Sequence, residues 1–96
     1  MSRLKSLFYS IFTARRRRYD LGVFGEEYFS PGRPDTERAR RYIDIFRPES
    51  VLDVGCGTGR LVHGFRLAGA DARGTEAAVA AIGCADPEVR PYLEVG

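Results

Sequence analysis

The sequence lacks the features of membrane-spanning, secreted and disulfide-rich proteins. No apolar run approaches the ~20 residues that a transmembrane helix needs. The short apolar stretch 7–14 is followed by four arginines instead of the small residues of a signal-peptide cleavage site. The two cysteines, Cys56 and Cys84, form no C-x-x-C pattern, so we expect neither a disulfide framework nor a metal site. A single bridge between them stays open, but the composition favours reduced thiols in a cytoplasmic protein.

Acidic residues are absent from the first 19 positions, which hold six basic residues. The rest of the chain holds nine basic and 13 acidic residues, and this mildly acidic body gives no support to nucleic-acid binding by the domain itself. Apolar residues of the first segment recur at helical spacing: Leu4, Leu7, Phe8, Ile11 and Phe12. We therefore predict that residues 1–18 form a basic amphipathic helix that packs across the domain. A membrane-surface helix, a nucleic-acid-binding arm ending in the arginine run 15–18, and a mitochondrial transit peptide are the alternatives.

The 96 residues suffice for one small domain. Residues 19–34 are rich in glycine, proline and aromatic residues, which predicts a loop. Periodicity and turn residues then predict helices at 35–46, 59–68 and 77–83 and strands at 51–54, 71–76 and 92–95. Asp35 is expected to cap the first of these helices, and Pro48 to end it. The alternation predicts an α/β domain over 35–96, with a Rossmann-like parallel sheet, flanking helices and right-handed crossovers.

A glycine-rich turn joins the first of these strands to the helix that follows it. Gly55, Gly57 and Gly59 permit backbone angles that other residues avoid, and they let a ligand approach the backbone. The third glycine comes one residue too early for the G-x-G-x-x-G dinucleotide fingerprint, and no lysine follows as a phosphate-binding loop would need. The turn therefore predicts a nucleotide-type crevice of another kind at the carboxyl end of the strand.

The run Asp53-Val54-Gly55-Cys56-Gly57-Thr58-Gly59 resembles motif I of class I S-adenosylmethionine-dependent methyltransferases. Glu76 stands 21 residues after the first glycine, where the second strand ends, and the run 69–76 is also similar to this family. The resemblance implies that the glycines, with Cys56 and Thr58 between them, face the methionine part of the cofactor. It implies that Asp53 holds the amino group of the cofactor, directly or through water. Glu76 would bind the ribose hydroxyls, and Ala77 would lie near the adenine.

The resemblance covers residues 20–96 and includes only the first three strands of the seven that this family has. It implies the N-terminal, cofactor-binding part of a methyltransferase, preceded by N-terminal helices. In the family's strand order, the strand 51–54 would have no neighbour on one side, which predicts self-association or a partner chain at an open sheet edge. The methyl acceptor and the catalytic residues are not indicated. A non-catalytic module that binds the cofactor or a protein partner is the alternative, and a nicotinamide-dependent oxidoreductase fragment is a weaker one.

Each of these residues also has a plainer interpretation. The glycines could serve a tight turn alone, Asp53 could be a satisfied core acid, and Glu76 could be a solvated strand end. His63, the single histidine, is interpreted as a surface or packing residue. The pair Tyr28 and Phe29 either packs in the core or lines the cofactor pocket.

Overall fold

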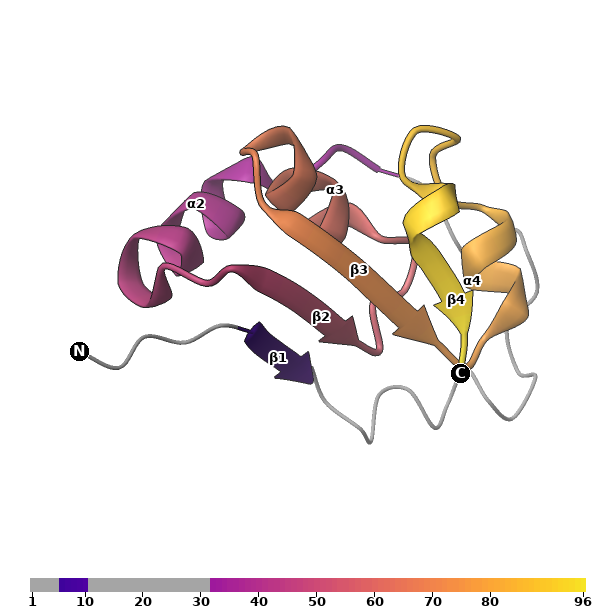
Figure 1. The fold of residues 1–96 in the computed structure, drawn as a ribbon. Helices are drawn as coiled ribbons and strands as arrows, with labels where there is room; N and C mark the ends of the chain where they lie inside the picture. Colours follow the sequence, from indigo (N-terminus) through magenta and orange to yellow (C-terminus); the bar gives the residue numbers. More distant parts are fainter. Residues whose placement is uncertain (1–5, 11–31) are drawn as a thin grey trace.

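In the part of the chain that the structure describes, four parallel strands form one sheet (Figure 1). The computed structural model describes the backbone of residues 6–10 and the whole of residues 32–96. In sequence and in space, the strands follow the order β1 (Ser6–Ser10), β2 (Ser50–Val54), β3 (Asp71–Glu76) and β4 (Leu93–Val95). The register pairs Asp53 of β2 with Gly74 of β3, and Glu76 of β3 with Val95 of β4. The carboxyl ends of the strands therefore meet at one edge of the sheet.

Helices flank the sheet and confirm the α/β class that the sequence predicts. They are α2 (Thr36–Phe46), α3 (Arg60–Leu67), α4 (Val79–Gly83) and the short 3-10 helix η2 (Arg90–Tyr92). Ala39 of α2 and Val62 and Phe65 of α3 are fully buried against the sheet residues Val51 and Ala72. Side chains alternate between the two faces of a strand. One face of the sheet therefore carries the core and the described helices, and every second residue of a strand points to the opposite face.

The α2 helix begins and ends where the sequence predicts. The Asp35 carboxylate accepts a hydrogen bond from the Arg38 backbone N–H at 3.2 Å, which satisfies one of the unpaired donors of the first turn. Arg47, which precedes Pro48, takes a left-handed conformation with φ of 45° and ends the helix. Phe46, the last residue of the helix, is 36% exposed.

The α3 helix ends at Leu67, one residue before the end of the predicted helix 59–68, and Gly69 follows its C-cap residue Ala68. This glycine has φ of 93° and donates its N–H to the Arg66 carbonyl, and Ala70 donates to the Phe65 carbonyl. These two hydrogen bonds form a Schellman motif, which a glycine in the left-handed region favours. Within the helix, Gly64 lies against the backbone of Asp35, so closely that a Cβ atom would collide with the Asp35 carbonyl oxygen. The contact brings the start of α2 onto α3.

The N-terminal prediction is wrong for residues 6–10. These residues form β1, which pairs with β2 in a parallel ladder, instead of a helix. The helical spacing of the apolar residues is a local pattern and takes no account of the rest of the sheet. An apolar strand such as β2 leaves a row of unpaired N–H and C=O groups if its edge is open. Pairing with β1 satisfies that edge. The expected open edge at 51–54 is therefore wrong as well. The other residues of the predicted helix, 1–5 and 11–18, and the loop residues 19–31 lie outside the described residues.

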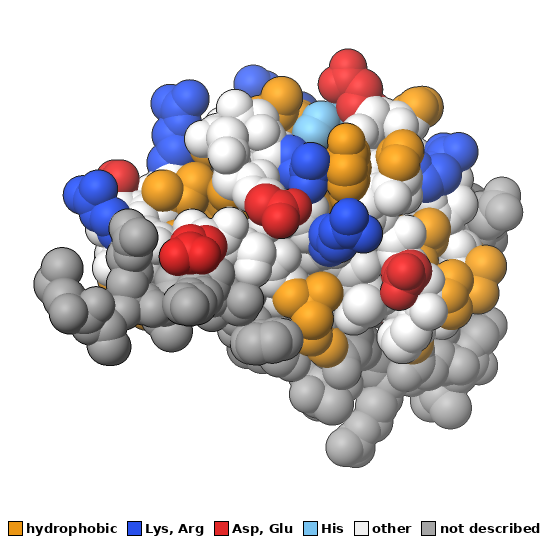
Figure 2. Space-filling model, viewed as in Figure 1, with side chains coloured by type: hydrophobic (Ala, Val, Ile, Leu, Met, Phe, Trp, Pro, Cys, Tyr) orange, Lys and Arg blue, Asp and Glu red, His pale blue; other side chains and the backbone are white. Residues whose placement is uncertain are grey.

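None of the helices that the structure describes is long and apolar enough to cross a membrane. In the view of Figure 2, the basic and acidic side chains of the described residues are interspersed and do not gather in a patch of one sign.

Candidate functional site

The glycine turn between β2 and α3 has the backbone shape that only glycine adopts readily. Gly55, Gly57 and Gly59 have φ of 84°, 61° and 83°. The N–H groups of Gly55 and Cys56 both donate to the Thr75 carbonyl, at 2.8 and 3.0 Å. The turn is therefore fastened to the end of β3, the neighbouring strand.

The surroundings of the glycines differ. A Cβ atom at Gly59 would lie 2.8 Å from a methyl carbon of Leu93, so this glycine is also required by the packing of the turn on β4. A Cβ atom at Gly57 would meet nothing within 4 Å. The backbone at Gly57 therefore borders open space, into which a ligand can fit close to the main chain.

Glu76, the last residue of β3, is fully buried although it carries a carboxylate. Its Oε1 atom accepts a hydrogen bond from the Gly57 N–H at 2.8 Å, and its Oε2 atom accepts one from the Ala78 N–H at 3.0 Å. The interpretation of Glu76 as a solvated strand end is wrong. A carboxylate oxygen has two lone pairs, so each oxygen retains one further acceptor position.

Asp53 is the second buried carboxylate of this edge, with 1% of its surface exposed. It lies on the same face of the sheet as Glu76, because its register partner Gly74 is two residues before Glu76. Burial raises the pKa of the Cys56 thiol, and the charges of Asp53 and Glu76 raise it further. Both carboxylates thus act on one sulfur atom in the turn, and this buried negative charge favours a ligand that carries positive charge.

Small and apolar residues after β3 and at the end of β4 lie at the same edge. Ala77 is exposed directly after Glu76, and Val79 at the start of α4 and Val95 at the end of β4 are 65% and 56% exposed. Thr58 is half-buried in the turn. The N-cap residue of α3 is Gly59, which has no side chain that could cap the helix.

The sequence analysis missed two residues of the site. Ala78 supplies the second N–H group to Glu76, and Gly74 makes room for the turn, because a Cβ atom there would lie 2.7 Å from the Cys56 Sγ atom. A glycine inside a strand often marks such a close approach, and Gly74 stands between Arg73 and Thr75 in β3. Gly74 was therefore the one feature of the sequence that could have indicated the close approach of the turn to β3. Nothing in the sequence points to Ala78.

His63 has a packing role. It is buried on α3, with its Nε2 atom 3.6 Å from an Oε2 atom of Glu88, so the surface interpretation is wrong and the packing interpretation is confirmed. Arg66, one turn further, lies over the Tyr92 ring at 3.4 Å from its centroid. These contacts hold the segment before β4 against α3. Tyr28 and Phe29 lie outside the described residues.

Cys56 and Cys84 are not joined in a disulfide. In the part of the chain that the structure describes, no three histidine, cysteine or acidic side chains group as metal ligands would.

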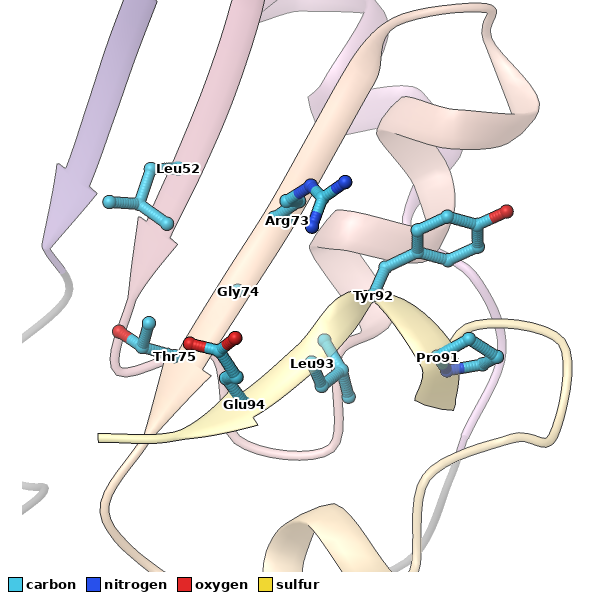
Figure 3. A pocket seen from close by; sticks show the side chains of 8 residues that line it. All are labelled: Leu52, Arg73, Gly74, Thr75, Pro91, Tyr92, Leu93 and Glu94. Atoms are coloured by element: carbon cyan, nitrogen blue, oxygen red, sulfur yellow. The ribbon is translucent and has the colours of Figure 1, made fainter.

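A hollow of about 80 Å³ lies on the opposite face of the sheet, away from Asp53 and Glu76. Figure 3 shows Leu52, Arg73, Thr75 and Glu94 around it, from three neighbouring strands, with Tyr92 and Pro91 at one side. We regard the carboxyl edge as the candidate site, because the buried carboxylates and the glycine turn converge there, whereas the hollow is small and open and holds no buried charge.

Comparison with known proteins gives no match to a family model, to a curated protein or to a solved structure. A function can therefore be inferred only from the geometry of the carboxyl edge and from the residues that form it.

Proposed function

We propose that the chain binds S-adenosylmethionine and forms the N-terminal, cofactor-binding part of a methyltransferase. The observation that carries the proposal is the arrangement of Asp53 and Glu76. These two buried carboxylates stand at the ends of neighbouring parallel strands, beside a glycine turn whose backbone borders open space. A ligand with an ammonium group, a sulfonium centre and a ribose matches two buried negative charges and carboxylate acceptors.

Each residue of the site then has a distinct task. The turn with Gly55, Gly57 and Gly59 accommodates the amino-acid part of the ligand against the main chain, next to Cys56 and Thr58. Asp53 holds the ammonium group, directly or through water. Glu76 accepts the ribose hydroxyls at its remaining lone pairs. Ala77 borders the adenine, and the exposed side chains of Val79 and Val95 offer it apolar surface.

Bound S-adenosylmethionine supplies an electrophilic methyl group on a positively charged sulfur. The task of this chain is to bind and orient the cofactor so that the methyl group faces the acceptor, since alignment and exclusion of water are what methyl transfer chiefly requires. No described residue is positioned as an acid, base or nucleophile for the acceptor. We therefore assign cofactor binding to this chain and leave the acceptor and the catalytic groups outside the proposal.

Calorimetric titration with S-adenosylhomocysteine tests the proposal, after circular dichroism has shown that the chain is folded. We expect saturable binding, and Glu76→Ala should weaken it about tenfold to a hundredfold, which corresponds to ~1.4–2.8 kcal/mol. Glu94→Ala is the matched control, because it removes an exposed carboxylate from the opposite face of the sheet. A nicotinamide dinucleotide should not compete. Competition would favour an oxidoreductase fragment.

A second candidate is a non-catalytic binding module, and the sheet face that carries the hollow favours it. Purely parallel sheets are normally covered on both faces, whereas the described helices of this chain cover one. Arg73 and Glu94 on the other face are exposed and have opposite charges. Sedimentation velocity of the wild type and of Arg73→Glu would test whether this face holds a second copy or a partner chain. Cofactor binding without methyl transfer to any acceptor of a broad panel would favour this candidate.

The remaining assignments are parts of the same proposal. We propose a cytoplasmic location from the composition and from the two cysteines, which form no disulfide. Contact of the arginine run 15–18 with a membrane or a nucleic acid is a separate hypothesis. Binding of a peptide of residues 1–18 to anionic vesicles and to duplex DNA would test it.

A further inference from the structure

The two oxygens of the Glu76 carboxylate bond to two different segments of the chain. Oε1 accepts from Gly57, in the turn that follows β2, and Oε2 accepts from Ala78, immediately before α4. Gly57 lies 19 residues before Glu76, so this hydrogen bond joins two strand ends that are distant in sequence. One side chain therefore connects the glycine turn to the start of α4.

These two hydrogen bonds compensate a costly burial. A fully buried carboxylate loses its hydration, and this loss must be offset by hydrogen bonds within the protein. Hydrogen bonds to a charged acceptor are stronger than those between neutral groups. The backbone also benefits from them, because the Gly57 N–H that donates to Oε1 belongs to a turn in which Gly57 has a positive φ of 61°. The carboxylate and the turn therefore stabilise each other's conformation.

We propose that Glu76 is a positioning residue that holds the two halves of the cofactor site at a fixed spacing, in addition to any contact with ribose. This inference rests on the proposed function, in which the turn receives the amino-acid part of the ligand and the segment 77–79 receives the adenine. A ligand held by the turn then fixes the Gly57 N–H, and through Glu76 it fixes the start of α4. The two parts of the ligand therefore bind cooperatively.

Amide hydrogen exchange of the ligand-free protein, followed residue by residue by NMR, tests the positioning role without any cofactor. In Glu76→Gln, one acceptor oxygen becomes an NH₂ group that cannot accept a hydrogen bond, so at least one of the two amides loses its acceptor, and we expect Gly57 or Ala78 to exchange at least about tenfold faster than in the wild type. Glu94→Gln is the control and should change neither amide. Unchanged exchange at both Gly57 and Ala78 in a folded variant would overturn the proposal.

Glu76→Asp serves if Glu76→Gln does not fold. It keeps the charge and shortens the side chain by one methylene group, so that the carboxylate can no longer reach both donors. We expect faster exchange at one or both amides. Wild-type protection at both would contradict the positioning role.

A ligand comparison separates positioning from ribose binding. The affinities of the wild type and of Glu76→Gln are measured for S-adenosylhomocysteine and for its analogue without the two ribose hydroxyls. If Glu76 only accepts the hydroxyls, the substitution costs nothing against the analogue. The positioning role predicts a loss of about fivefold or more against the analogue as well. If the wild type binds neither ligand, the proposed function fails, and the exchange measurement still decides the positioning role.

Discussion

The Sγ atom of Cys56 occupies the space beside Gly74 that a Cβ atom would need. A Cβ atom at Gly74 would lie 2.7 Å from Sγ and 3.0 Å from a methyl carbon of Val62. The contact sets the glycine turn directly on β3, the strand that carries Glu76. The strand β3 therefore needs a glycine at position 74, between Arg73 and Thr75. The distance between the turn and β3 depends on that glycine.

Gly74→Ala should therefore destabilise the fold and displace the turn. Overpacking of a close contact typically costs about 1–3 kcal/mol, and we expect a loss of unfolding free energy in that range in urea denaturation. Cofactor affinity should fall as well, because Cys56 can yield only by moving the turn. Gly83→Ala is the control, since a Cβ atom at Gly83 meets nothing within 4 Å and this glycine ends a helix. Equal stability of the wild type and Gly74→Ala would contradict the packing described for the turn.

Gly64→Ala should destabilise the fold without a specific effect on the site. The added Cβ atom would collide with the Asp35 carbonyl, which is backbone and cannot rotate away. We expect the unfolding free energy to drop by about 1–3 kcal/mol or more, with the midpoint of thermal unfolding as the measurement. The fraction of Gly64→Ala that stays folded should bind S-adenosylhomocysteine with wild-type affinity. A stability equal to that of the wild type would show that α2 and α3 are not in the contact described.

Asp35→Ala should remove the cap of α2. The carboxylate accepts from the Arg38 N–H and lies 3.1 Å from the Arg38 Nε atom. Loss of an N-cap typically costs about 0.5–2 kcal/mol, and we expect a decrease of that size in the unfolding free energy. Asp44→Ala, an exposed substitution on the same helix, should change stability much less. An equal effect of both substitutions would argue against the cap.

The Cys56 thiol should react slowly with alkylating reagents at neutral pH. Burial and the neighbouring carboxylates raise its pKa above the ordinary value of 9.0, and the thiolate is the reactive form. In the unfolded chain the same thiol ionises near its ordinary pKa, so the folded state binds the proton more tightly. This contribution to stability is complete below pH 9.0 and is lost as the pH rises further.

Alkylation followed by peptide mass spectrometry measures this protection. We expect Cys56 to be modified at the rate of global unfolding below pH 9, and to react freely in urea. The stability of Cys56→Ala should fall less steeply above pH 9 than that of the wild type. Rapid modification of Cys56 in the folded protein at pH 7 would contradict the buried, negatively charged surroundings that we describe.

Local patterns predicted the elements whose ends are set by local chemistry. The strand Asp71–Glu76 has its predicted ends, and the Asp35 cap lies where the residue type places it. The strand Ser6–Ser10 was not predicted, because its conformation is decided by pairing with a strand more than 40 residues away. Within a short apolar segment, helical spacing does not exclude a strand, and tertiary pairing overrides such a weak preference.

The site was predicted in part for a similar reason. The glycine turn and the two carboxylates are visible as residue types at a recognisable spacing. The burial of Glu76 and its hydrogen bonds to Gly57 and Ala78 are not visible, because they depend on how two strand ends approach each other. The sequence therefore indicated which residues form the site. The structure adds that Glu76 accepts hydrogen bonds from the backbone that follows β2 and from the backbone that follows β3.

The most direct test of the central claim is calorimetric titration of the folded chain 1–96 with S-adenosylhomocysteine, together with Asp53→Asn and the control Glu94→Ala. We expect saturable one-to-one binding, weakened at least about tenfold by Asp53→Asn, which removes a buried charge, and unchanged by Glu94→Ala. Absence of binding by a chain whose circular dichroism shows it to be folded would contradict the assignment of the carboxyl edge as a cofactor site.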